Sequence, residues 1–260
     1  MSRLPVVFFG HGSPMVALEK SDTTRAWADI AARIGKPRAI LCVSAHWLTR
    51  GTAVTAMRQP PTIHDFGAFP QALFDVQYPA PGDPELALRI RDLLAPMPVS
   101  VDQSWGLDHG TWSVLVHAFP EADVPVVQLG MDVAKSPAEH WAIGQALRPL
   151  RDEGVLIMGT GNIVHNLPAM DWGNPTAPPY PWAKRFNDTM LDAIVADRPE
   201  TVIDFEAMGE DAKLSVPTPD HFWPLLYVLG ARHPGERAEL APNFIHHKSL
   251  SMTSVLIDAA

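Results

Sequence analysis

Cysteine is nearly absent from this chain of 260 residues. The one copy, Cys42, lies inside an apolar run formed by residues 40–43. A single thiol cannot form an internal disulfide, and a cysteine in such a run is typically a buried core residue. Both features fit a reducing compartment, so we expect a cytoplasmic protein.

Cationic residues are also few, and long apolar runs are missing. The chain has 20 Lys and Arg against 29 Asp and Glu, which gives a formal net charge of −9. Nucleic acids and anionic membranes attract clustered Lys and Arg, so this charge opposes both as partners. No apolar run approaches the roughly 18 residues of a membrane-spanning helix. The apolar segment at residues 4–9 is too short for the core of a signal peptide. We expect no nucleic acid and no membrane as partner.

Apolar residues make up 47% of the chain and recur in short runs, which is enough material for a packed core. Runs of strand length, most of them rich in β-branched residues, predict buried strands at Val6–Phe9, Ala39–Ser44, Val124–Leu129, Val155–Met158, Val202–Phe205 and Ser254–Ile257. Segments with helical spacing lie between them, at Thr23–Ile34, Pro84–Leu94, Pro137–Arg151, Ala183–Ala196 and His221–Ala231. This alternation predicts an α/β fold, with a mixed, largely parallel sheet covered by helices on both faces. No repeat or long linker divides the chain, so we expect residues 1–260 to form a single domain.

Four of the eleven histidines lie in small or polar segments close behind predicted strands: His11, His46, His109 and His165. In open α/β sheets, the loops that leave the carboxyl ends of the strands form the ligand crevice. Separate strands can therefore bring these imidazoles to one place. Each histidine alone is more often structural, but the set favours a metal or acid–base site.

His221 joins this set by a different route. Asp220 before it is a plausible N-cap, and the apolar residues behind it predict a buried helix. The dipole at the start of a helix disfavours imidazolium, so His221 is expected to stay neutral, the form that binds metal. No pair of these histidines has the compact spacing of a zincin or a zinc finger.

The other histidines carry less information. His64 lies in an aromatic loop with a glycine, which suits a lid or a pocket wall. His246 and His247 are neighbours, and neighbouring residues on a strand point to opposite faces, so at most one of them is expected in a site. His117, His140 and His233 are interpreted as structural or exposed.

In order along the chain, these segments resemble the class III, LigB-type extradiol dioxygenases, and within them the branch similar to 4,5-DOPA dioxygenase. The resemblance runs from His11 to about Thr253. It is carried by Gly10-His11-Gly12-Ser13-Pro14, Ser44-Ala45-His46-Trp47, His64-Asp65-Phe66, Asp108-His109-Gly110, Gly159-Thr160-Gly161-Asn162 with His165-Asn166, and Pro219-Asp220-His221-Phe222.

The resemblance implies a LigB-like single catalytic domain and a role for each motif residue. His11, His46 and His221 match the metal ligands, whereas the protocatechuate-cleaving relatives carry a glutamate at the last of these positions. His165 and His109 match the acid–base histidines. We also expect Ser13 and His64 to contact substrate. The family's usual Gly-Ser-Gly is Gly159-Thr160-Gly161 here, a change that keeps the hydroxyl group.

The chemistry of the residues agrees with this resemblance. Ferrous iron in such oxygenases needs protein ligands on one face and open positions for substrate and O₂. Three neutral imidazoles leave the dipositive charge on the ion, and a bidentate catecholate can offset it. The expected reaction inserts both atoms of O₂ into a catechol beside its hydroxyl carbons. The expected partners are a small aromatic substrate and O₂, and Fe²⁺ is the expected cofactor. Zn²⁺ binds such ligands more tightly, so it can occupy the site in the purified protein.

Two other functions fit parts of this pattern. In a zinc hydrolase, the metal would lower the pKa of bound water and His165 or His109 would act as base. The Memo family resembles the same fold and is associated with interaction and signalling roles, although the complete histidine set has no evident use in a binding module. The sequence leaves open the particular catechol, the regiochemistry, the native metal, the oligomeric state, and whether His165 is an additional ligand.

Overall fold

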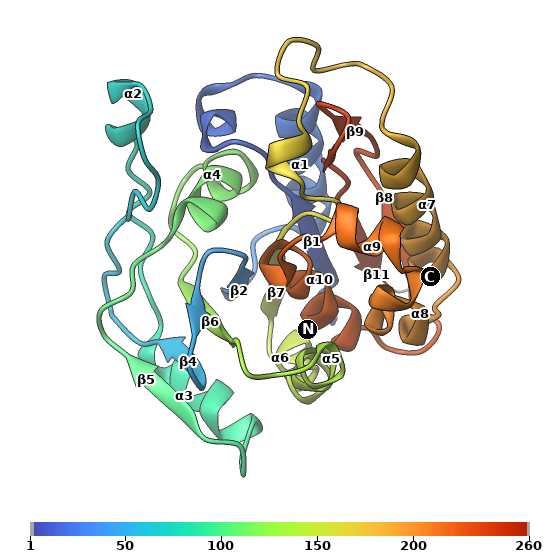
Figure 1. Cartoon of the computed structure of the whole chain (residues 1–260). Helices are drawn as coiled ribbons and strands as arrows, with labels where there is room; N and C mark the ends of the chain where they lie inside the picture. Colours follow the sequence, from blue (N-terminus) through green and yellow to red (C-terminus); the bar gives the residue numbers. More distant parts are fainter. Residues whose placement is uncertain (1–2, 259–260) are drawn as a thin grey trace.

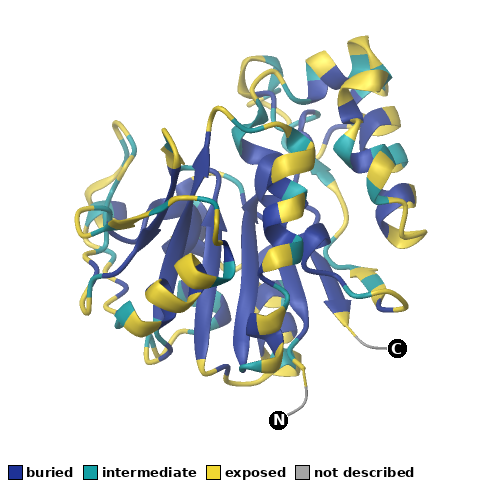
Figure 2. Ribbon diagram, turned by 90° about the horizontal axis from the view of Figure 1, so that it is seen from below, coloured by how far each residue is buried: buried dark blue, intermediate teal, exposed yellow. Residues whose placement is uncertain are grey.

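The computed structural model describes residues 3–258, and a mixed β-sheet runs through its middle (Figures 1 and 2). This nine-stranded sheet has the order β5-β4-β6-β2-β7-β1-β11-β8, and β3 pairs with β6 beside that path. Its strands are β1 (Val6–Gly10), β2 (Ala39–Ser44), β3 (Leu48–Thr49), β4 (Thr52–Thr55), β5 (Val99–Asp102), β6 (Val126–Asp132), β7 (Val155–Gly161), β8 (Arg237–Leu240) and β11 (Val255–Asp258). A separate hairpin joins β9 (Ile245–His246) to β10 (Leu250–Ser251).

The centre of the sheet is parallel, and its edges are mixed. Strand β7 pairs in parallel with both β1 and β2, and β2 pairs in parallel with β6. Strands β4 and β11 attach antiparallel to β6 and β1. The central strands are buried on both faces, which explains why they appear in the sequence as continuous apolar runs.

Helices cover both faces of the sheet, and alternate residues of strand β1 pack against the helices on opposite faces. Val7 and Phe9 belong to the core beneath α1 (Asp22–Ile34) and α4 (His109–Ala118). Val6 and Phe8 face the opposite layer, which contains α3 (Pro84–Leu93), α5 (Pro137–Ala146), α7 (Pro181–Val195) and α10 (Trp223–Gly230). Figure 2 shows the buried strands between helices whose outer faces are exposed. The expected α/β architecture is confirmed.

Short helices complete the chain. They are η1 (Pro14–Leu18), α2 (Gln71–Phe74), α6 (Pro149–Asp152), η2 (Leu167–Ala169), α8 (Pro199–Ile203), η3 (Phe205–Met208), α9 (Glu210–Ser215) and η4 (Pro219–His221). No helix within residues 3–258 has the length and apolar character needed to cross a bilayer.

Three predicted elements differ from the structure. The strand expected at 202–205 is wrong, because this segment spans the end of α8 and the start of η3. Val202 and Phe205 are both buried, three residues apart, which is helical and not strand spacing. The single helix expected at 137–151 is broken before Pro149, which begins α6. The helix expected from residue 221 begins at Trp223, after the η4 turn.

Close packing between α5 and α10 gives a stability test. A Cβ atom at Gly144 in α5 would lie 2.3 Å from the carbonyl oxygen of Tyr227 in α10. Helix propensity alone would favour alanine, but here the two helices must separate. We expect Gly144→Ala to lose about 1–3 kcal/mol in the free energy of unfolding, measured by urea denaturation. Gly67→Ala is the matched control, because no atom lies within 4 Å of its added Cβ. Equal stability of the two variants would contradict this packing.

Candidate metal centre

Five histidines from distant parts of the chain meet at the carboxyl edge of the central strands. His11, His46 and His165 follow β1, β2 and β7, which are neighbours in the sheet. His109 is the first residue of α4, and His221 lies in η4. The ring centroids of His11 and His46 are 5.3 Å apart, and the ring of His221 lies 5.5 Å and 5.0 Å from them. The predicted convergence of these imidazoles is therefore present.

Two glycines allow this approach. A Cβ at Gly110 would lie 2.6 Å from Cδ2 of His46, and a Cβ at Gly161 would lie 2.1 Å from the carbonyl oxygen of His221. Asn162 then ties the two sides together. Its backbone N–H donates to the carbonyl of His221 at 2.8 Å, and its Nδ2 donates to the carbonyl of His11. The backbone around these histidines is thus fixed by close packing as well as by hydrogen bonds.

The pair of His11 and His46 fits a shared ion. Their Nε2 atoms lie 3.1 Å apart. Two nitrogens bound side by side to one metal at about 2.1 Å would lie about 3.0 to 3.4 Å apart. The side chain of His11 is 1% exposed, so its nitrogen faces a protected space. The donor set and its spacing suit a divalent transition metal.

Burial keeps these imidazoles neutral. Desolvation lowers the pKa of His11 well below its ordinary value, and the neighbouring histidines lower it further. Burial together with His109 lowers the pKa of His46 to about 3, although Asp65 opposes this shift. Burial and the adjacent His221 lower the pKa of His165 to about 3. Neutral imidazole has a free lone pair, so the set can bind a cation at neutral pH.

His221 is held by the carboxylate next to it in the chain. Its Nδ1 is hydrogen-bonded to Oδ2 of Asp220, which leaves Nε2 available to the cluster. Asp220 does not act as the expected N-cap, because the Phe222 position precedes α10 and no side chain caps that helix. Burial lowers the pKa of His221 to about 4, against the opposing effect of Asp220. Burial, more than the expected helix dipole, accounts for the neutral ring.

His109 has a similar partner from a distant loop. Asp65 accepts a hydrogen bond from the backbone N–H of His109 at 2.8 Å, and its Oδ2 lies 3.0 Å from the ring Nδ1. Burial raises the pKa of Asp65, but its contacts with His109 outweigh this effect and lower it. Sequence reasoning missed Asp65, although it lies beside the singled-out His64.

Two histidines, His109 and His221, are candidates for a third metal ligand beside His11 and His46. Nitrogen atoms of His11, His46 and His109 all lie within 4.8 Å of one another. The ring of His109 is 3.8 Å from that of His46 but 6.2 Å from that of His11. The ring of His221 is more evenly placed between the two, and His165 stacks on its outer face with centroids 3.6 Å apart.

Comparison with known proteins decides the family. The model of the family described as the catalytic LigB subunit of aromatic ring-opening dioxygenase matches residues 6–256. The chain belongs to the LigB family. A protein named 4,5-DOPA dioxygenase extradiol from Escherichia coli K12 is 48% identical over 260 residues, covering 98% of this chain and 95% of its own. A protein of the same name from Beta vulgaris is 40% identical, covering 91% and 90%.

A solved structure agrees with this membership. The crystal structure of an uncharacterized protein from Escherichia coli K12 matches with a TM-score of 0.86 and 42% identity, covering 98% of this chain and 100% of that one. The expected extradiol dioxygenase family, the enzyme class and the LigB-like fold are confirmed.

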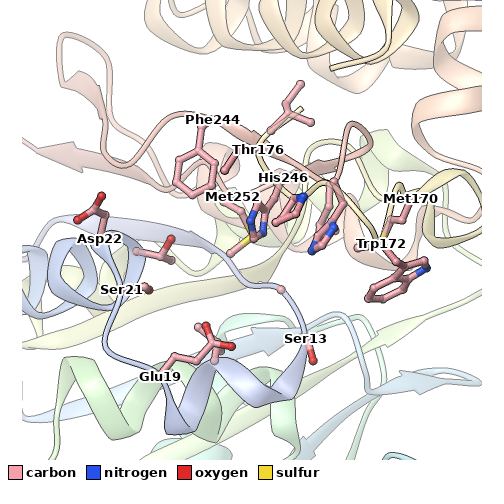
Figure 3. Close-up of a pocket in the computed structure, with 17 residues that line it drawn as sticks. Ser13, Glu19, Ser21, Asp22, Met170, Trp172, Thr176, Phe244, His246 and Met252 are labelled. Carbon is pink, nitrogen blue, oxygen red and sulfur yellow. The ribbon is translucent and has the colours of Figure 1, made fainter. Parts of the chain in front are cut away.

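This LigB-family chain has a pocket of about 540 Å³, with Ser13 and His246 among its lining residues (Figure 3). Gly12 and Ser13 follow His11 and line it, and Leu250, another lining residue, pairs with His165 in a β-bridge. Across from Ser13, His246 lies on the opposite wall. His247 also lines the pocket, although neighbouring residues on a strand would point to opposite faces. The reason is backbone geometry: His247 has a φ of 49° and has left the strand.

The two expected substrate residues lie in different places. Ser13 is on the pocket wall, where its hydroxyl also accepts a hydrogen bond from the N–H of Met15. His64 does not line this pocket. Its Nε2 lies 3.0 Å from the carbonyl of Val76, and its ring packs against Phe66 and Trp112. A substrate role for either residue stays a prediction.

The low pKa values give a pH test on metal-free protein. Histidines that stay neutral in the fold take up protons only on unfolding, so unfolded chains hold more protons below the ordinary pKa of 6.5. The free energy of unfolding should therefore rise with pH from about 4 to about 6.5 and level off above it. Each such histidine contributes up to about 1.4 kcal/mol per pH unit. His165→Gln should flatten this slope, measured by denaturation at several pH values. An unchanged slope would show that His165 is protonated in the fold.

Proposed function

We propose that this chain opens the ring of a substituted catechol by inserting both atoms of O₂ beside the hydroxyl carbons, at a metal held by His11, His46 and His221. The observation that carries the proposal is the 3.1 Å separation of Nε2 of His11 from Nε2 of His46, within a group of neutral imidazoles. Membership of the LigB family supports the same reaction class. The whole chain is proposed to act as one catalytic domain.

His221 is proposed as the third ligand in preference to His109. Its Nδ1 is committed to Asp220, so Nε2 is the nitrogen that remains for an ion. Its ring is almost equally distant from the rings of His11 and His46, whereas the ring of His109 lies against His46 alone. This placement of the rings supports His221, whereas the ring nitrogens that lie within 4.8 Å of one another belong to His11, His46 and His109.

Fe²⁺ is proposed as the active metal, with Zn²⁺ as a tighter but inactive occupant. When bound, iron would supply the redox chemistry that lets O₂ react with a catechol ring. The protein would bind and orient the substrate and handle its protons. His165 is partly exposed beside the cluster and neutral, so it can accept a proton from a catechol hydroxyl. His109 would form a hydrogen bond with a substrate oxygen.

The substrate class follows from the pocket and from the relatives. Both relatives described above are named for DOPA, a catechol with an amino-acid side chain. The pocket beside Gly12 and Leu250 has a volume typical of small-molecule sites. Its lining residues include no Lys or Arg to pair with a carboxylate. We propose that the catechol ring lies at the histidines and that its substituent extends into this pocket, with Ser13 on the wall. The cytoplasmic location stays a prediction.

Metal content tests the ligand set. His11→Ala and His221→Ala should each weaken binding of Zn²⁺ or Fe²⁺ by at least about 10- to 100-fold. Loss of a residue that only hydrogen-bonds a ligand typically has an effect of this size, and loss of a ligand itself should cost at least as much. His109→Ala should keep the metal. His117→Ala is the control, because that ring bonds the carbonyl of Val16 away from the cluster. Elemental analysis after anaerobic loading measures the result. If His109→Ala lost the metal and His221→Ala kept it, the third ligand would be His109.

Activity tests the reaction itself. Protein loaded anaerobically with Fe²⁺ should consume O₂ with a panel of catechols and form a yellow semialdehyde, and Zn²⁺-loaded protein should not. His165→Ala should lower kcat by about 10²–10⁴ with its metal retained. If His165→Ala kept most of its kcat, the proton-transfer role would be wrong. Hydrolysis of an ester or amide by the Zn²⁺ form, with no O₂ consumed by the Fe²⁺ form, would overturn the proposal in favour of a hydrolase.

A further inference from the structure

Asp65 belongs to an exposed loop, but its carboxylate turns inward beneath His109. The side chain of Asp65 is 18% exposed, and that of His109 is 8% exposed. Oδ1 of Asp65 accepts the backbone N–H of His109 at 2.8 Å, and Oδ2 lies 3.0 Å from Nδ1 of the same residue. One carboxylate therefore contacts both the backbone and the ring of a single histidine.

The loop that carries Asp65 is tied to the start of α4. The N–H of Ile63 donates to the carbonyl of Leu107 at 2.9 Å, and Nε1 of Trp112 donates to the carbonyl of Ile63 at 2.9 Å. These bonds lie on both sides of His109 in the sequence. The position of Asp65 relative to the ring is thus set by the backbone and by a buried tryptophan.

We propose that Asp65 is a positioning residue that fixes the tautomer and the rotation of His109, with the proton on Nδ1 and the lone pair on Nε2. A backbone N–H can only donate, so it occupies one carboxylate oxygen. The other oxygen can only accept, so the nitrogen that faces it must carry a proton. The Nδ1 contact is not well aligned, but catalytic hydrogen bonds often tighten only when substrate binds.

This tautomer decides what His109 can do. It leaves the lone pair on Nε2, and the His109 ring offers a nitrogen within 4.8 Å of nitrogens of His11 and His46. With this tautomer, Nε2 can accept a hydrogen bond from a substrate hydroxyl or bind a metal, but it cannot donate one. The inference deepens the role proposed above for His109 and rests on that proposed function for its kinetic part only.

The proposal makes a distinctive prediction for Asp65→Asn. The amide oxygen of asparagine must take over the bond from the backbone N–H, because the amide NH₂ cannot accept it. The NH₂ group then faces Nδ1 and donates to it, which moves the ring proton to Nε2. A residue with a purely structural role would loosen the ring on substitution but would not reverse its tautomer.

Asp220 provides a matched comparison. It bonds Nδ1 of His221, and its other partners are the hydroxyl of Thr218 and its own backbone N–H. Because this carboxylate serves a different ring, Asp220→Asn should leave the tautomer of His109 unchanged. Asp83→Asn is a second control, because Asp83 caps α3 and contacts Arg38 on the surface.

Nitrogen NMR of metal-free protein labelled with ¹⁵N-histidine tests the proposal without any activity. His109→Gln identifies the His109 signals by their loss. For His109, we expect Nδ1–H in the wild type, in Asp83→Asn and in Asp220→Asn, and Nε2–H in Asp65→Asn. An Nε2–H tautomer of His109 in the wild type would overturn the proposal, and this result does not depend on how the variant folds. An unchanged tautomer in folded Asp65→Asn would overturn it as well.

Steady-state kinetics of the Fe²⁺-loaded protein form the second measurement. Asp65→Asn should lower kcat by about 10²–10⁴ with KM changed only a few-fold, and Asp65→Glu should restore part of it. If Asp65→Asn reversed the tautomer of His109 but left kcat unchanged, His109 would have no role in the reaction. Asp65 would still be the residue that positions the His109 ring. If the wild type consumed no O₂ with any catechol, the proposed function would fail, and the NMR result would still decide the positioning role.

Discussion

Neutral imidazole is the constraint on which the rest of this structure depends. Several histidine rings lie within about one ring diameter of one another, and protonating them together would place like charges side by side. Burial removes this conflict because it disfavours each cation, and it lowers the pKa of His46 and His165 to about 3. Asp65 and Asp220 act in the opposite direction, but desolvation outweighs them. The fold therefore maintains a set of imidazole lone pairs at neutral pH.

The parallel centre of the sheet explains why such distant residues can meet. Strands β1, β2 and β7 are neighbours and end at the same edge, so the residues that follow them share one place, although His165 is more than 100 positions from both His11 and His46. The histidines can approach one another closely only where neighbouring residues have no side chain. Gly110 beside His46 and Gly161 beside His221 meet this requirement. His11 and His46 lie just after strands, whereas the pocket is lined by parts of η1, α1 and the β9–β10 hairpin together with residues 170–176.

Much of the fold and of the histidine cluster could be predicted from sequence, because the signals are local. A continuous apolar run followed by a glycine or serine and a histidine marks a buried strand and its exit, and this identified His11, His46 and His165. The short strands β4 and β5 lack such runs, so they were not predicted. Residues 202–205 were predicted as a strand because four residues are too few to distinguish helical from strand periodicity. Asp65 could not be found in this way. Its partner is 44 positions away, and only the folded loop shows that its side chain turns inward.

The carboxylates of Asp65 and Asp220 can also compensate the charge of a bound metal ion. Three neutral ligands would leave a dipositive ion without compensation in a buried site, which is unfavourable unless opposite charge lies nearby. Burial alone would raise the pKa of Asp65 and of Asp220, yet their histidine partners lower both, so both are ionised at neutral pH. Two negative charges thus lie one imidazole away from the cluster. They can offset a dipositive ion while they occupy none of its positions, which leaves those positions open to substrate and O₂.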